Sequence, residues 1–143
     1  MGEYNMIIQK KIRIDSKGFN DIHDISAALR AHLADSALSD GHMIVFVPGS
    51  TGALTTIEFE PGLLEDFPQM LEKIAPMGTP YNHDRTWHDG NGYAHLRASL
   101  IGPSITIPFE RGKLILGTWQ QVIFLDFDNR PRQRELHVQI FGE

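Results

Sequence analysis

The stretch that decides the fold is Val122-Ile123-Phe124-Leu125-Asp126-Phe127, an apolar run near the end of the chain. Its length and its β-branched and aromatic residues are typical of a β-strand. The chain around it has the same character, so the last third of the sequence is predicted to be rich in strands. The predicted strands are Ile105–Phe109, Leu114–Gly117, Val122–Phe127 and Glu135–Phe141, with a tight hairpin connection at Glu110-Arg111-Gly112 between the first two.

The first half of the chain adds two helices and more strands. An opening strand contains Met6, Ile8, Ile12 and Ile14 on one face, and buried or extended stretches follow at Met43–Val47 and Leu54–Glu58. The first helix, capped by Asn20 or Asp21, has an apolar stripe of Ile22, Ile25, Leu29 and Leu33. The second begins at Pro61, and its stripe is Leu64, Phe67, Leu71 and Ile74. This order predicts an α+β fold, a large and mostly antiparallel β-sheet with two main helices packed on one face.

Length and composition narrow the class of protein. A chain of 143 residues with 41% hydrophobic residues is expected to form one domain, residues 1–143. No apolar run approaches the roughly 20 residues of a membrane helix, and Met1-Gly2-Glu3-Tyr4 does not resemble a secretion signal. We therefore expect a cytoplasmic protein that binds no membrane. The net charge of −5 argues against a nucleic-acid partner.

The polar stretch Tyr81–His95 contains the residues with the clearest chemistry. Three of the seven histidines, His83, His88 and His95, fall within thirteen residues, and Asp84 and Asp89 are interleaved with them. The chain has no cysteine, so any metal must be held by histidine, carboxylate or water. Imidazole is a common ligand of zinc, and a catalytic zinc takes three protein ligands and water. The three histidines are therefore predicted to bind a divalent metal such as zinc. The alternative is a solvated loop that happens to be rich in histidine.

Two other polar groups are candidates for binding an anion. The turn Gly49-Ser50-Thr51-Gly52 can present backbone N–H groups to a phosphate, although a plain turn explains it as well. Arg130, Arg132 and Arg134 alternate before the last strand, either as an anion site or as a solvated basic edge. Glu58 ends an apolar strand, which is a common position for an acid that points into a site.

A family resemblance extends over most of the chain. Gly117-Thr118-Trp119-Gln120, followed by Val122-Ile123-Phe124, resembles the hallmark of the YjbQ-like family, often described as secondary thiamine-phosphate synthases. The other matching segments, in the same order as in the family, are Val45–Pro48, Ala53–Glu58, His83-Asp84, Ala94–Leu96, Ala98–Leu100, Gly102–Ser104 and Gln139–Glu143.

The resemblance implies a mostly antiparallel α+β fold, a homotrimer with sites near the subunit boundaries, and a histidine-bound metal. His83 and His95 match family histidines, whereas His88 matches only one branch of the family. Many relatives have a histidine where this chain has Gly49, which puts the activity of this chain in question.

The function that the resemblance implies is a metal-dependent transferase similar to thiamine-phosphate synthase, acting on a phosphorylated small molecule. A metal and arginines can stabilise a departing diphosphate. The expected roles are Glu58, Asp84 and Arg97 in catalysis and Ser50, Thr51 and Ser99 in substrate binding, with the metal on His83, His88 and His95. The alternatives are a metal-assisted hydrolase of a small phosphorylated metabolite and a non-catalytic trimer that binds a metal or ligand.

Overall fold

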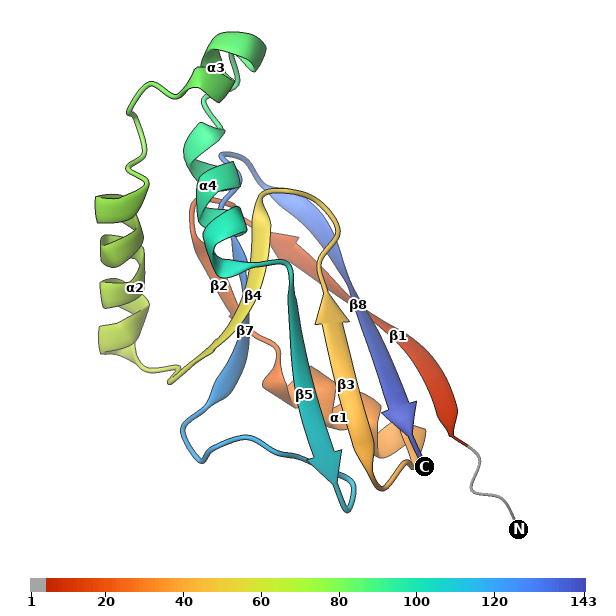
Figure 1. Ribbon diagram of the computed structural model, residues 1–143. Helices are drawn as coiled ribbons and strands as arrows, with labels where there is room; N and C mark the ends of the chain where they lie inside the picture. The colour runs from red at the N-terminus through yellow and green to blue at the C-terminus, as the bar shows by residue number, and fades with distance from the viewer. Residues whose placement is uncertain (1–4) are drawn as a thin grey trace.

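The structure is a computed structural model, and it describes residues 5–143. Within this range, strands and four helices form a mixed α+β architecture (Figure 1). The elements, in chain order, are β1 (Met6–Ser16), β2 (Asp21–Asp24), α1 (Ser26–Ser36), β3 (Gly41–Phe46), β4 (Gly52–Ile57), α2 (Pro61–Ile74), α3 (Asn82–Trp87), α4 (Gly92–Ile101), β5 (Ser104–Glu110), β6 (Lys113–Leu114), β7 (Gln121–Asp126) and β8 (Arg132–Gly142).

The strands form two antiparallel sheets. The larger has the order β1-β8-β3-β5-β6, and the smaller has the order β2-β7-β4. The predicted hairpin is present, because Glu110 pairs with Lys113 across Arg111 and Gly112, which both have positive φ. The predicted α+β fold with a mostly antiparallel sheet is confirmed, and the structure adds that the strands divide into two sheets.

Strand β7 is buried on both of its faces, and this places it between two hydrophobic cores. Val122 and Phe124 belong to one core, whereas Ile123, Leu125 and Phe127 belong to the other. Alternate side chains of a strand point to opposite faces, so the period-two pattern explains this division. The first core also contains the inner residues of the five-stranded sheet and of α1, and the second contains residues of α2 and α4.

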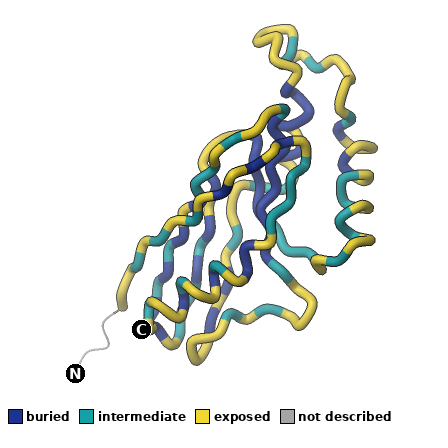
Figure 2. Tube along the Cα trace, turned by 180° about the vertical axis from the view of Figure 1, so that it is seen from behind, coloured by how far each residue is buried: buried dark blue, intermediate teal, exposed yellow. Residues whose placement is uncertain are grey.

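The helices cover these cores to different extents. Helix α1 buries Leu29 and Leu33, four residues apart, in the first core. Helix α4 buries Tyr93, Ala94, Arg97 and Ala98, and it packs against β4. Helix α2 buries only Leu71, and its trace alternates between intermediate and exposed in Figure 2. Helix α2 is therefore only sparsely buried, and the short helix α3, which buries no residue, is less buried still.

The predicted start of the first helix is wrong. Residues Asp21–Asp24 form strand β2, which pairs with β7, and the helix begins at Ser26. The side chain of Asp21 accepts hydrogen bonds from the Lys17 N–H and from His23, and so stabilises the turn before the strand. Ile22 fits a helical stripe equally well, but the free edge of β7 gives its backbone a pairing partner.

The segment from Tyr81 to Tyr93, for which the sequence predicted neither a helix nor a strand, contains helix α3 and the start of helix α4. Apolar residues occur around much of α4, where Tyr93 is buried and Leu96 is half exposed. A helix with apolar residues on several sides lacks the stripe by which helices are detected in a sequence.

Buried charge surrounds the end of β7. Asp126 is fully buried, and both of its oxygens accept hydrogen bonds from Arg134, from Nε at 2.7 Å and from Nη2 at 2.9 Å. Asp128 accepts hydrogen bonds from Arg132 and from the Thr51 hydroxyl. Burial raises the pKa of Asp128, but these hydrogen bonds lower it by more, so the net pKa lies below its ordinary value. Two of the three arginines suspected of binding an anion are thus paired with acids inside the protein.

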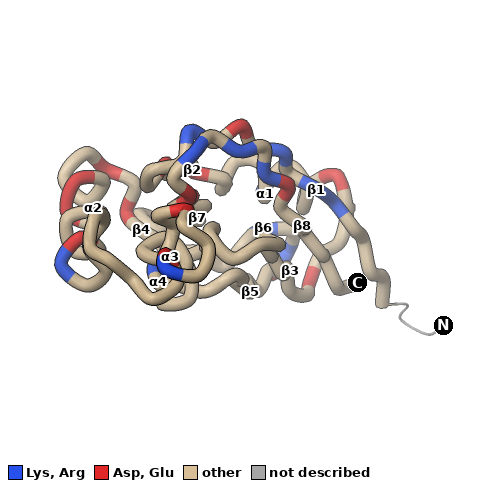
Figure 3. Tube along the Cα trace, turned by 90° about the horizontal axis from the view of Figure 1, so that it is seen from above, with Lys and Arg blue, Asp and Glu red and all other residues tan. Residues whose placement is uncertain are grey.

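The remaining charges lie mainly on the surface. A run of basic residues follows β1 in Figure 3, and two of them, Lys11 and Arg13, pair with Glu135 on the neighbouring strand β8. Exposed pairs of this kind contribute little stability. Across residues 5–143, no helix has the length and apolar character needed to span a membrane.

We predict that Arg134→Met lowers the free energy of unfolding by about 3–5 kcal/mol, because it leaves Asp126 as a buried charge without a partner. Urea unfolding followed by circular dichroism measures the loss. Arg132→Met is the matched control, because its buried partner Asp128 keeps the Thr51 hydroxyl and Arg134 at 3.7 Å, so the loss should be less than about 1.5 kcal/mol. Equal losses in the two variants would contradict the role given to Arg134.

Candidate metal site

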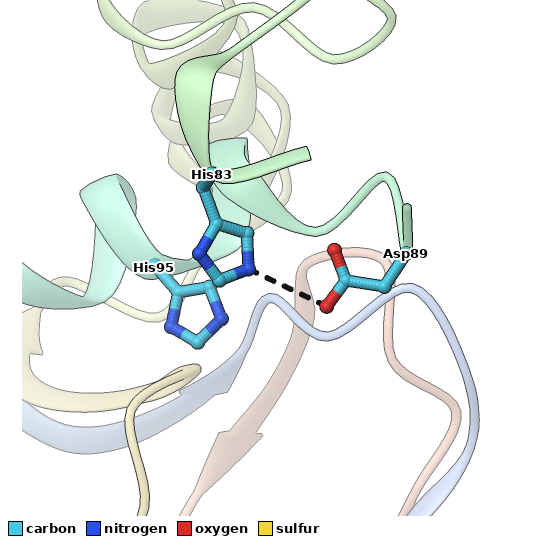
Figure 4. A group of neighbouring side chains, drawn as sticks. All are labelled: His83, Asp89 and His95. Carbon is cyan, nitrogen blue, oxygen red and sulfur yellow. Dashed lines mark hydrogen bonds and ion pairs between the residues drawn. The ribbon is translucent and has the colours of Figure 1, made fainter. Parts of the chain in front are cut away.

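His83, Asp89 and His95 converge at the top of the molecule, where α3 meets α4 (Figure 4). One ligand atom from each residue lies within 4.8 Å of the others. The two imidazole rings are 4.4 Å apart between centroids, and His83 Nε2 is 3.4 Å from Asp89 Oδ2. Two nitrogens and one carboxylate oxygen therefore face a common point at which a cation could bind.

Asp84 and Gly92 bring the two helices together. The Asp84 carboxylate accepts a hydrogen bond from the Gly92 N–H at 2.9 Å and one from the Tyr81 N–H at 3.4 Å. It thereby joins the first turn of α3 to the first residue of α4. A Cβ at position 92 would lie 2.7 Å from the Cβ of Tyr81, so only glycine permits this approach. Asp84, expected to be a general base or to fix a ligand, holds the backbone that carries His83 and His95.

The loop that carries Asp89 is held from two sides. Asp89 Oδ1 accepts a hydrogen bond from the Asn91 N–H at 3.1 Å, and the Asp89 carbonyl accepts one from Asn129 Nδ2 at 2.6 Å. The Asn129 N–H in turn donates to Oδ1 of Asn91, which is buried. Outer contacts of this kind fix the direction of a ligand before the metal binds.

Asp89 is held as a carboxylate. Partial burial raises the pKa of Asp89, but the hydrogen bonds from the Asn91 N–H and from His83 lower it by more. The net pKa lies below the ordinary value for aspartate, so the side chain is ionised at neutral pH. An ionised carboxylate supplies the negative charge that a divalent cation requires from its ligands.

His88, predicted to be the third metal ligand, is not part of this group. Helix α3 ends at Trp87, and His88 follows it in the left-handed conformation with φ 53°. The residue is exposed, and the reversal of the chain at this point brings Asp89 to the two histidines in its place. In the sequence, His88 and Asp89 are adjacent and either could have been the third ligand. The turn at His88 decides that Asp89 is the one that reaches His83 and His95.

Arg97, predicted to stabilise a departing diphosphate, lies inside the fold and not in an open site. Its side chain is fully buried, and its Nε and Nη2 donate to the Ala75 carbonyl at 3.0 and 2.9 Å. The same guanidinium donates to Asn20 and Glu72. It thus connects the end of α2 to α4, and it is not among the residues grouped with His83 and His95. Hydrogen bonds from the Met77 N–H and from Arg97 hold the pKa of Glu72 below its usual value.

The other predicted residues fall into two groups. Ser50 and Ser99 line one shallow pocket of about 220 Å³, between the β3–β4 turn and α4. Thr51 is buried beneath that turn, where its hydroxyl contacts Asp128 and Arg134. Glu58 is exposed beyond the end of β4 and is not among the residues grouped with the histidines. Ser99 lies one helical turn after His95 and donates a hydrogen bond to its carbonyl.

Comparisons with known proteins identify similar sequences. The family model described as UPF0047 protein YjbQ-like matches residues 10–143. A UPF0047 protein of Archaeoglobus fulgidus is 49% identical over 100 residues, which cover 70% of this chain and 77% of that protein. The UPF0047 protein YugU of Bacillus subtilis is 29% identical over 93% of this chain and 98% of its own length.

Solved structures show the same fold. The crystal structure of a YbjQ-like protein of unknown function from Sulfolobus solfataricus superposes with a TM-score of 0.92 at 27% identity, covering 98% of this chain and all of that one. An uncharacterised conserved protein of the yjbq/upf0047 family from Clostridium acetobutylicum has a TM-score of 0.83 at 35% identity, covering 92% and 98%.

These comparisons overturn the predicted thiamine-phosphate synthase-like transferase. The similar proteins are described only as UPF0047 proteins, and the structure from Sulfolobus solfataricus is of a protein of unknown function. None of these descriptions includes a transferase activity. The position of Arg97 agrees with this correction, because the arginine assigned to the leaving group is fully used inside the fold.

We predict that Arg97→Met lowers the free energy of unfolding by about 2–4 kcal/mol, because the buried Ala75 carbonyl loses its donors. Thermal unfolding and urea unfolding would both measure this loss of stability. Arg85→Met, on the exposed face of α3, is the control and should change stability by less than about 0.5 kcal/mol. A variant at position 97 as stable as the unmodified protein would contradict this structural role.

Proposed function

The chain belongs to the YjbQ-like family of UPF0047 proteins, and we propose that it binds one divalent metal ion, best matched by zinc, through His83, Asp89 and His95. The observation that carries the proposal is the convergence of the three side chains from α3, α4 and the loop between them. His83 and Asp89 are six residues apart along the chain, as are Asp89 and His95. This spacing matches no local metal-binding motif, so the fold brings the three side chains together.

The distances support a shared ion. In a tetrahedral zinc site with bonds of about 2.0–2.2 Å, neighbouring ligand atoms are separated by roughly 3.3–3.6 Å. His83 Nε2 and Asp89 Oδ2 are already 3.4 Å apart. The largest separation in the group, up to 4.8 Å, requires a shift of about 1 Å, which rotation of a half-buried imidazole can supply.

The ligand types favour zinc or a similar first-row metal. Two imidazoles and one carboxylate match the histidine and carboxylate sets of zinc sites, whereas calcium and magnesium prefer oxygen ligands. Three protein ligands leave one position of a tetrahedral ion for water or for a small molecule. A small-molecule partner is therefore part of the proposal. The cytoplasmic location is a separate matter and stays a prediction.

The homotrimer implied by the family resemblance is also kept as a proposal. Large apolar side chains are exposed on the single chain, including Trp119 at 71%, Trp87 at 69% and Ile7 at 60%. These side chains lie on separate elements, so the trimer proposal rests on the family resemblance, and subunit contacts would cover some of them.

We predict that the purified protein takes up about one zinc ion per chain and that His83→Ala weakens binding at least about a hundredfold. Loss of an outer contact alone already costs 10–100-fold, and His83 would be a direct ligand. Titration of the metal-free protein with zinc against a competing chelator measures the affinity, and elemental analysis measures the stoichiometry.

His88→Ala is the matched control for that experiment, because His88 is exposed and lies outside the group. It should leave the zinc affinity unchanged within about threefold. If His88→Ala removes the metal and Asp89→Ala does not, the set predicted from the sequence is correct and the present one is wrong.

We also predict a mass near 48 kDa in solution, three times the 16.1 kDa of one chain. Size-exclusion chromatography with multi-angle light scattering provides the measurement. A mass near 16 kDa at micromolar concentration would refute the homotrimer without affecting the metal proposal.

A further inference from the structure

A pocket of about 380 Å³ opens directly beside the two histidines. Its lining residues are Tyr81, Asn82, His83, Gly92, His95 and Leu96. A volume of this size is within the range of small-molecule sites. Because both histidines belong to its wall, a molecule in the pocket would lie next to any ion that they hold.

The walls of this pocket lack positive charge. Its lining residues include no lysine or arginine, and the polar side chains besides the histidines are those of Asn82 and Tyr81. The Tyr81 hydroxyl donates to the Pro76 carbonyl at 2.7 Å, so tyrosine contributes its ring and not a free hydroxyl. Gly92 adds no side chain, and Leu96, 50% exposed, forms an apolar side of the pocket.

Anion recognition by the pocket walls themselves, apart from the metal ion, would need different residues. Phosphate sites in proteins present arginine, lysine or several free N–H groups to the oxygens. Arg97 on the same helix is buried and fully paired, and the Gly92 N–H donates to Asp84. Transfer of apolar surface into the pocket, in contrast, is favourable at about 25 cal/mol per Å².

We propose that this pocket takes the uncharged, apolar part of a small molecule whose oxygen donor binds the metal held by His83, Asp89 and His95. The inference rests on the proposed metal-binding function and names the ligand class for that site. The molecule is thus a metal-binding oxygen ligand with a short apolar or aromatic body, and not a phosphate ester that binds through its charge.

Two leucines on α4 allow a matched test. Leu96 lines the pocket, whereas Leu100, one helical turn later, does not. Both are about equally exposed, at 50% and 57%, so replacing either with asparagine leaves the hydrophobic cores intact. Leu96→Asn removes apolar wall from the pocket, and Leu100→Asn makes the same chemical change outside it.

The experiment uses acetohydroxamate and benzohydroxamate, which share a zinc-chelating head and differ by a methyl group against a phenyl ring. Each is titrated by calorimetry into zinc-loaded protein, after the zinc content has been verified. We expect benzohydroxamate to bind about tenfold more tightly, since its ring buries apolar area in the pocket. Leu96→Asn should reduce this ratio to about two and leave both acetohydroxamate affinity and zinc content unchanged, and Leu100→Asn should keep the tenfold ratio.

The outcomes separate the two proposals. Protein that holds no zinc contradicts the metal site, and the pocket proposal fails with it. Zinc-loaded protein that binds both hydroxamates equally, or that loses the preference equally in Leu96→Asn and Leu100→Asn, contradicts the pocket proposal alone. Inorganic phosphate that displaces benzohydroxamate at equal concentration would also overturn it, because the site would then select charge.

Discussion

The burial of β7 on both faces is the constraint on which the rest of the structure depends. Val122 and Phe124 enter one core and Ile123 and Leu125 the other, so a shift of the strand by one residue would exchange the two sets. The same strand therefore fixes the layers on both sides: the five-stranded sheet and α1 on one face, and α2 and α4 on the other. Strand β7 also pairs with β2 on one edge and β4 on the other, and so forms the centre of the smaller sheet.

The end of β7 also carries the buried charges that connect the hydrophobic cores to the candidate metal site. Asp126 and Asp128 are neutralised by Arg134 and Arg132, which holds the turn between β7 and β8 in place. Asn129 in that turn donates to the carbonyl of Asp89. The position of the candidate metal site is thus tied to the central strand through one short turn, although the site itself lies where α3 meets α4.

Sequence patterns were sufficient where local periodicity and tertiary packing agree. The long strands have clear repeats, and Pro61 marks the start of α2 as expected. Of the stripe predicted for α2, however, only Leu71 is buried, and Ile74 is 56% exposed. The pattern was wrong at Ile22, where pairing with β7 outweighs a helical stripe. His88 as a metal ligand stays a prediction, while the left-handed conformation at His88 places Asp89 beside His83 and His95. The burial of Arg97 depends on the end of α2, which is distant in sequence from α4. Contacts between distant segments leave no local signal in the sequence. The sequence therefore identifies the polar residues near the histidines but does not reveal the role of each one.

The sparse packing of α2 has a consequence for motion. Helix α2 lies on the outside of the fold (Figure 1) and buries only Leu71. The carbonyl of Ala75, at its C-terminal end, accepts hydrogen bonds from Arg97 of α4. Segments with few buried contacts open locally at a lower free energy than the core. Backbone amides of α2 should therefore exchange with solvent well before those of β7, as a separate cooperative unit. Because α3 follows α2 along the chain, an ion held between His83 and His95 would slow this opening and couple the fluctuations of the outer layer to occupancy of the site.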